Sequence, residues 1–211
     1  MALLAKLKEL SKMTVNVWGF TMSNTVFKDF RFRFDRSLQA AAYFVKLAGG
    51  VEYHLRLLKL LYIADRHYLL SYGEMITGDH VVALKHGPVL TNIFDLIKGR
   101  GVRADKWACH LQTLPESHKI RLIDDPRTGS LCRASQKLLD DVYTQYGRMS
   151  RFQLRDLTHT FPEWKKYFRE GAAMSIPWED ILRLNGGEKM VPSAMNSIEV
   201  DEYQYALLGV G

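Results

Sequence analysis

The sequence predicts a mainly α (α+β) fold: a compact helical domain around one central buried helix, with a small antiparallel β element. From His54 to Tyr72 almost every residue is apolar or aromatic, and a helix that is apolar around most of its circumference lies in a core. The short β-forming run Val81–Leu84 follows turn residues. Gly and Pro separate several further amphipathic segments of helical length.

Residues 1–35 are predicted to form an N-terminal extension, because their pattern differs from that of the remaining chain. We expect a short amphipathic helix over 1–12 and a β-like run over 15–21. Apolar and charged residues alternate over 26–34, which is typical of a strand or an extended arm. A poorly ordered extension is the alternative, and Met22 competes with Met1 as the translation start.

The main domain is expected over 36–185, followed by a C-terminal tail over 186–211 that contains one more helix. Short β-forming runs on both sides of Pro115 predict a small hairpin or an irregular β excursion within 106–125. The helices of the domain are predicted, in order, over 36–47, 54–72, 88–98, 136–146 and 152–158, then after Pro162, and over 179–184.

Residues typical of helix ends support these boundaries. Gly73 is expected to end the central helix, since glycine adopts the left-handed conformation without penalty. Pro88 is expected as the first residue of its helix, where a missing N–H costs nothing. Ser135 is a predicted N-cap, and Thr160 and Glu163 have the spacing of a capping box.

The charge distribution makes nucleic-acid binding a minor alternative. Seven basic and three acidic residues in the first 36 positions account for most of the formal net charge of +6. The main domain is therefore close to neutral and has no basic stripe for phosphate binding. Cys109 and Cys132 lack C-x-x-C spacing, so we expect neither a disulfide framework nor a zinc finger, and a reducing, cytoplasmic compartment.

No motif predicts an enzyme, a cofactor or a catalytic residue. The sequence has no G-x-S-x-G elbow and no phosphate-binding glycine loop. A metal site made by His80, His86 and His159 with Asp65 or Asp79 is a minor hypothesis, because no metal-ligand spacing supports it. We expect His86 and His159 instead to be buried and hydrogen-bonded.

Polar residues inside the central helix have two interpretations. The structural interpretation is that they form internal ion pairs or extend their charged groups to the surface. The functional interpretation is that they shape a groove for a partner. The residues concerned are Lys59, Asp65 and Arg66. The structural interpretation is favoured. Trp164, close to Thr158 and His159, presents the same choice between a core residue and a binding residue.

Four segments together resemble one protein family. They are KLLYIADRHYLLSYGEMITGD (59–79), VVALKHGPVLTNIFDLIKG (81–99), FQLRDLTHTFPEWKKY (152–167) and IPWEDIL (176–182). In this order and spacing they resemble the Panacea domain of SocA-like antitoxins, also described as GepA-type phage-associated proteins, over about 36–184. The matching motif residues, with a structural or partner-binding role, are Lys59, Tyr62, Asp65, His86, Gly87, Pro88, Thr158, His159 and Trp164.

The resemblance implies a cytoplasmic antitoxin that neutralises a cognate toxin by direct protein contact. A proteolytic adaptor that delivers a toxin to the ClpXP protease is the alternative, and a metal-dependent hydrolase is less favoured. Some members carry an added DNA-binding domain, but we see no helix-turn-helix here. The oligomeric state stays open.

Partner contacts are predicted in the N-terminal arm and in the tail around Tyr203, because aromatic and basic residues outside a core need an explanation. The candidates in the arm are Phe30, Arg31, Phe32 and Arg33. The alternative is that the arm adds a strand to the small β element.

Overall fold

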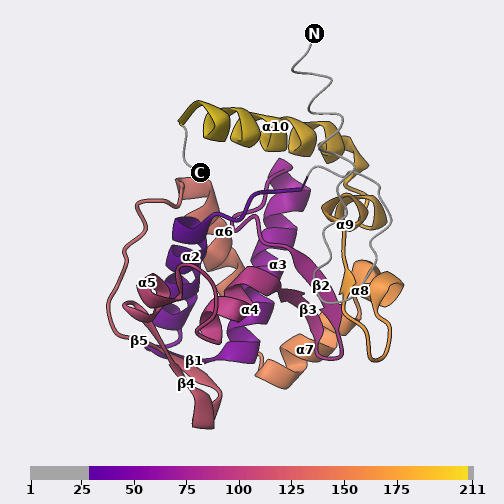
Figure 1. Cartoon of the computed structure of the whole chain (residues 1–211). Coiled ribbons are helices and arrows are strands. Elements are labelled where there is room, and N and C mark those ends of the chain that lie inside the picture. The colour runs from indigo at the N-terminus through magenta and orange to yellow at the C-terminus, as the bar shows by residue number, and fades with distance from the viewer. Residues whose placement is uncertain (1–28, 209–211) are drawn as a thin grey trace.

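A computed structural model describes residues 29–208 and places one long helix, α3 (His54–Tyr72), at the centre of the molecule (Figure 1). α2 (Phe34–Leu47), α6 (Arg133–Tyr146) and α7 (Arg151–His159) pack against it. The expected fold class, a mainly α structure around a central buried helix, is confirmed. The helix expected over 1–12 and the β run expected over 15–21 lie outside the described residues.

The central helix has the predicted bounds. It is buried on most sides because its sequence places apolar side chains around most of its circumference. Leu57, Leu60 and Tyr62 are completely buried, although they point to different sides of the helix. The helix ends at Gly73, whose φ of 67° is left-handed as expected. Burial of a Leu side chain contributes about 1.5–3 kcal/mol, so this helix supplies much of the hydrophobic stabilisation.

The other helices surround this centre and mostly agree with the prediction. α10 crosses one end of the molecule, whereas α7 lies at the opposite end (Figure 1). The remaining helical elements are α4 (Thr91–Ile97), α5 (Ala104–Ala108), η1 (Pro115–Ser117), α8 (Pro162–Tyr167), α9 (Trp178–Leu184), η2 (Glu188–Met190) and α10 (Val191–Leu208).

Two small antiparallel sheets complete the fold. The first has the strand order β1-β5-β4 and contains the predicted hairpin, and the second has the order β3-β2-β6. Their strands are β1 (Val51–Tyr53), β4 (Leu111–Leu114), β5 (Lys119–Leu122), β2 (Val81–Leu84), β3 (Gly87–Leu90) and β6 (Met174–Ser175). β3 packs against α3, and β5 packs against α2. The two sheets therefore extend the helical core and do not form a separate layer.

The prediction that Pro88 begins a helix is wrong. Pro88 lies in β3 opposite Ala83, and the helix begins three residues later at Thr91. β3 is an edge strand, where a residue without an N–H is tolerated. Gly87 forms the tight turn between the strands with a φ of 92°, which a glycine adopts readily.

Two predicted helix caps are also wrong. Cys132 is the N-cap of α6, and Ser135 lies inside the first turn, where its hydroxyl donates to the Cys132 carbonyl at 2.8 Å. The N-cap of α8 is Phe161, and Thr160 donates to the Leu157 carbonyl. The Ser150 cap of α7, by contrast, forms a complete capping box with Gln153.

Among residues 29–208, no helix combines the length and the hydrophobicity that crossing a lipid bilayer requires.

Candidate functional site

Three of the four motif segments meet at one point between α3, the β2–β3 hairpin and α7. Lys59 of α3 donates a 2.6 Å hydrogen bond from Nζ to the carbonyl of Pro88. A Cβ atom on Gly87 would lie 2.6 Å from Thr158 Oγ1 and 3.0 Å from Lys59 Nζ. Only glycine therefore allows these three elements to approach so closely. We call Lys59, Gly87, Pro88 and Thr158 the motif hub.

Lys59 is a completely buried lysine with no carboxylate partner in the described chain. Burial lowers the pKa of its ammonium to about 7, because a low-dielectric interior disfavours the charged form. Its one hydrogen bond links the centre of α3 to the edge strand β3. Of the alternatives considered for the polar residues of this helix, an ion pair between Lys59 and Asp65 is not formed.

Glu163 lies at the centre of a second polar cluster, beside the hub. This fully buried carboxylate accepts hydrogen bonds from Tyr62 at 2.7 Å, from Arg66 at 2.8 Å and from Asn185 at 2.9 Å. Burial raises the pKa of Tyr62 well above its usual value, and the charge of Glu163 raises it further. Arg66 also stacks on the ring of Phe161 at 4.3 Å. The cluster ties α8 and α9 to α3.

Aromatic rings cover the outer side of the hub. His159 stacks on Trp164 at 4.0 Å, and Trp164 stacks on Phe168 at 4.6 Å. The indole N–H of Trp164 donates to the Leu84 carbonyl at 3.0 Å, so it holds the end of β2. Burial, and next the charge of Lys59, lower the pKa of His159.

The two aspartates considered as metal ligands bind backbone groups instead. Asp65 accepts the N–H of Thr77 at 2.9 Å and also the hydroxyl of that residue. Asp79 accepts the N–H groups of Asn92 and Ile93, both at 2.9 Å, and so caps α4 from outside the helix. Burial raises the pKa of both carboxyl groups, that of Asp65 to about 7, against the opposing effect of these hydrogen bonds.

The three histidines of the metal hypothesis do not converge. His80 lies 3.3 Å from Asp29, and His159 belongs to the aromatic stack. His86 was expected to be buried, but it is exposed in the β2–β3 turn. The expectation that His159 is buried and hydrogen-bonded is also wrong, since the residue is half-buried and its Nε2 has no hydrogen-bond partner among the described residues. Within residues 29–208, no group of three potential metal ligands lies together.

The described part of the N-terminal arm is extended, docks on the domain and adds no strand to a sheet. Phe30 is only 7% exposed and packs edge-on against Trp178 at 5.4 Å. Arg33 donates to the Met75 carbonyl at 2.7 Å and pairs with Asp201 and Glu74. The other two predicted contact residues are Arg31, which is exposed, and Phe32, which is half-buried and packs against the core.

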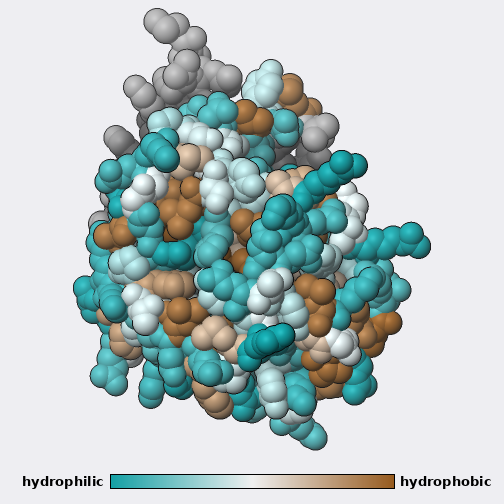
Figure 2. Space-filling view, turned by 180° about the vertical axis from the view of Figure 1, so that it is seen from behind, coloured by the Kyte–Doolittle hydropathy of each residue, from teal (hydrophilic) through white to brown (hydrophobic). Residues whose placement is uncertain are grey.

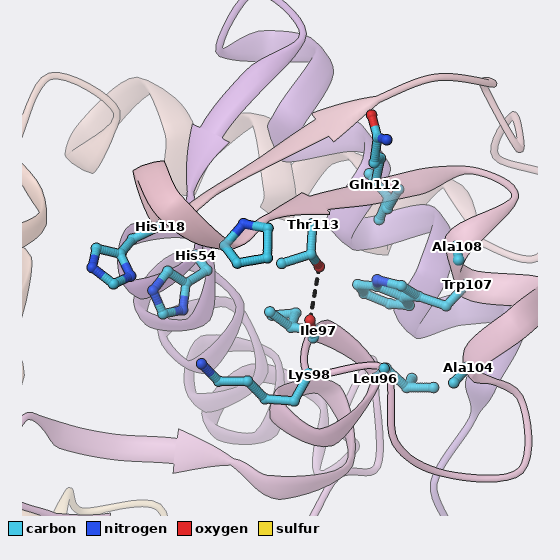
Figure 3. A pocket seen from close by; sticks show the side chains of 13 residues that line it. His54, Leu96, Ile97, Lys98, Ala104, Trp107, Ala108, Gln112, Thr113 and His118 are labelled. Carbon is cyan, nitrogen blue, oxygen red and sulfur yellow. Dashed lines mark hydrogen bonds between the residues drawn. The ribbon is translucent and has the colours of Figure 1, made fainter.

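An apolar groove of about 680 Å³ lies directly beside the hub. The β2–β3 turn, the first turn of α3, α4 and the start of α7 form its walls. It adjoins a second hollow of about 570 Å³, and the two share His54, Lys98 and His118. Figure 3 shows that these three side chains lie together at one end of the second hollow, with Trp107 at the other end. The sequence did not predict this groove, because residues from five separate segments line it.

Figure 2 shows that hydrophobic residues on the face opposite to that of Figure 1 form small patches between hydrophilic ones. Isolated hydrophobic groups of this kind are usual on protein surfaces.

Comparison with known proteins gives one match. The family model described as antitoxin SocA-like, Panacea domain, matches residues 57–165, which are more than half of the chain. The matched region begins in α3, includes the hub and ends in α8. No curated protein and no solved structure matches the chain.

Proposed function

The chain belongs to the family of SocA-like antitoxins with a Panacea domain, and we propose that it neutralises a cognate toxin by binding that protein directly. In this role the chain is a binding protein and not an enzyme. We place the interaction in the cytoplasm, where Cys109 and Cys132, which are both free and exposed, stay reduced.

One observation carries this proposal: the family match covers the hub, and the hub residues are occupied in packing. Lys59 and Thr158 are completely buried and bonded to the backbone. Gly87 has no room for a side chain. Motif residues of this kind support a rigid scaffold that presents a surface, which is what a protein-binding function needs.

Co-expression tests the proposal. The adjoining open reading frame is expressed from an inducible promoter, with and without this chain, in cells that have or lack ClpX. Direct binding predicts that the chain restores growth in both strains and that the two proteins copurify. Rescue that requires ClpX would show a proteolytic adaptor, and absence of both rescue and copurification would reject the proposal.

A further inference from the structure

Three cationic side chains surround the apolar groove, and none of them has a carboxylate partner within residues 29–208. They are Lys85, Lys98 and Arg151. Elsewhere the chain pairs many of its exposed cations, as in Lys46–Asp125 and Lys106–Asp35, both at 2.7–2.8 Å. Around the groove, by contrast, Lys98 lies over the ring of Phe94, and Arg151 lies over Tyr53 and Phe152. Among the described residues, none that lines the groove is acidic.

The floor between these cations is apolar. Leu58, Leu84, Val89 and Phe94 line it, and Phe152 at its edge is 51% exposed. Aromatic side chains in such positions are common anchors of protein interfaces. An apolar floor within a cationic rim favours a partner that has the complementary arrangement.

Two buried nitrogen atoms of the second hollow, one where it meets the groove and one at its other end, also lack a hydrogen-bond partner among the described residues. They are Nδ1 of His54 and Nε1 of Trp107, whose side chain is only 1% exposed. Unpaired buried polar atoms are rare in proteins and cost about 1–3 kcal/mol each. Burial lowers the pKa of His54, and the nearby Lys98, His118 and Arg151 lower it further. An incoming carboxylate would relieve this unfavourable electrostatic environment.

We infer that this groove binds a surface segment of the toxin in which apolar side chains are flanked by Asp or Glu residues. The inference rests on the proposed function, and it specifies where on this chain the toxin would bind and which side chains would contact it. The apolar side chains occupy the floor next to Phe152, and the carboxylates face Lys85, Lys98 and Arg151. The hub positions one wall, since the bonds from Lys59 to Pro88 and from Trp164 to Leu84 fix both strands of the hairpin.

Charge reversal on the rim tests the inference. We would measure binding of the purified product of the adjoining open reading frame to the wild-type chain, to a Lys85→Glu/Arg151→Glu double variant and to Phe152→Ala. Lys189→Glu is the matched control: Lys189 is exposed, also lacks an ion pair in the described chain, and precedes α10 at the far end of the molecule (Figure 1). Thermal unfolding of each variant verifies that the fold is retained.

The double variant is expected to bind at least about tenfold more weakly, mainly through slower association, because rim charges steer the encounter. Its association rate should also lose the dependence on ionic strength that the wild-type chain shows. Phe152→Ala should weaken binding about tenfold through faster dissociation. Lys189→Glu should bind like the wild-type chain.

The remaining outcomes separate the inference from the proposed function. If the wild-type chain binds and all folded groove variants bind equally well, the docking site lies elsewhere and only the inference fails. If the wild-type chain does not bind, the proposed function itself fails. If the wild-type chain forms a dimer that the groove variants dissociate, the groove binds a second copy, which also overturns the inference.

Discussion

Lys59 has an environment that is unusual for a lysine. It is buried in the centre of α3, with the Pro88 carbonyl as its hydrogen-bond acceptor. In the unfolded chain its pKa is near 10.5, whereas in the folded protein it is about 7. Between these values the unfolded state binds the proton and the folded state has released it. The contribution of Lys59 to stability therefore improves as the pH rises.

A Lys59→Met variant tests this pH dependence. Relative to the variant, the free energy of unfolding of the wild-type chain should rise from about pH 7 to about pH 9, by up to about 1.4 kcal/mol per unit. Chemical denaturation at several pH values measures this difference. A Cys132→Ser variant is the control, because the Cys132 thiol of the wild-type chain titrates in the same range. A hydrogen bond with Ser135 is the main reason that the pKa of this thiol is lowered to about 7. Parallel curves for the wild type and Lys59→Met would contradict the prediction.

Glu163 gives a second prediction at this scale. Glu163→Gln removes the charge that faces Arg66, whose side chain is only 12% exposed. Leaving a buried charge without its partner costs about 3–5 kcal/mol, so denaturant unfolding should show a loss of at least 2 kcal/mol, somewhat below that range because Gln retains an acceptor oxygen. Glu188→Gln, an exposed position, should change stability by less than about 0.5 kcal/mol. Equal effects of the two substitutions would show that the cluster is not stabilising.

The β2–β3 hairpin is the element that links the hub to the groove. Its turn requires a positive φ at Gly87, and its edge strand lies against Lys59 and Thr158. Two different constraints therefore apply at one glycine: backbone conformation and space. A second glycine of similar conformation, Gly50, has a φ of 91° and no atom within 4 Å of its missing side chain.

The pair Gly87→Ala and Gly50→Ala separates these constraints. Both variants place an alanine in the left-handed region, which costs about 1–2 kcal/mol. Only Gly87→Ala also forces a side chain into the hub, with an additional cost of about 1–3 kcal/mol. Gly87→Ala should therefore have the lower melting temperature and the weaker toxin binding. A Gly50→Ala variant that is equally or more impaired would argue against the close packing of the hub.

Local sequence patterns predicted the elements that local interactions determine. The bounds of α3 and the Gly73 cap follow from periodicity and helix-end residues. Pro88 was misassigned because its strand depends on pairing with Ala83 and on packing against Lys59, which no short window contains. The start of α4 is fixed by Asp79, more than ten residues upstream.

The candidate site was predictable only in part. The resemblance identified Lys59, Gly87 and Thr158 as motif residues, but spacing alone did not indicate that they touch. Glu163 was assigned to a capping box, because the sequence gives no sign that it faces Tyr62 across about a hundred positions. The groove depends on how distant segments pack, so it becomes visible only in the folded structure.

At the scale of the whole molecule, the buried polar clusters and the cations around the groove have two different roles. Buried clusters around Lys59 and Glu163 connect the elements to α3. The cations around the groove form no ion pair with another residue of the described chain, and in our proposal they face the toxin. The proposed binding function needs both features: a rigid interior, and a surface whose cations can pair with the acidic residues of a partner.

The most direct test of this account is a titration of the purified toxin with the purified chain in the absence of any protease. Direct neutralisation predicts that the activity of the toxin falls with each addition and is abolished at stoichiometric amounts, and that the Lys85→Glu/Arg151→Glu variant requires a large excess. Inhibition that appears only after ClpXP and ATP are added, or no inhibition at all, would contradict the account.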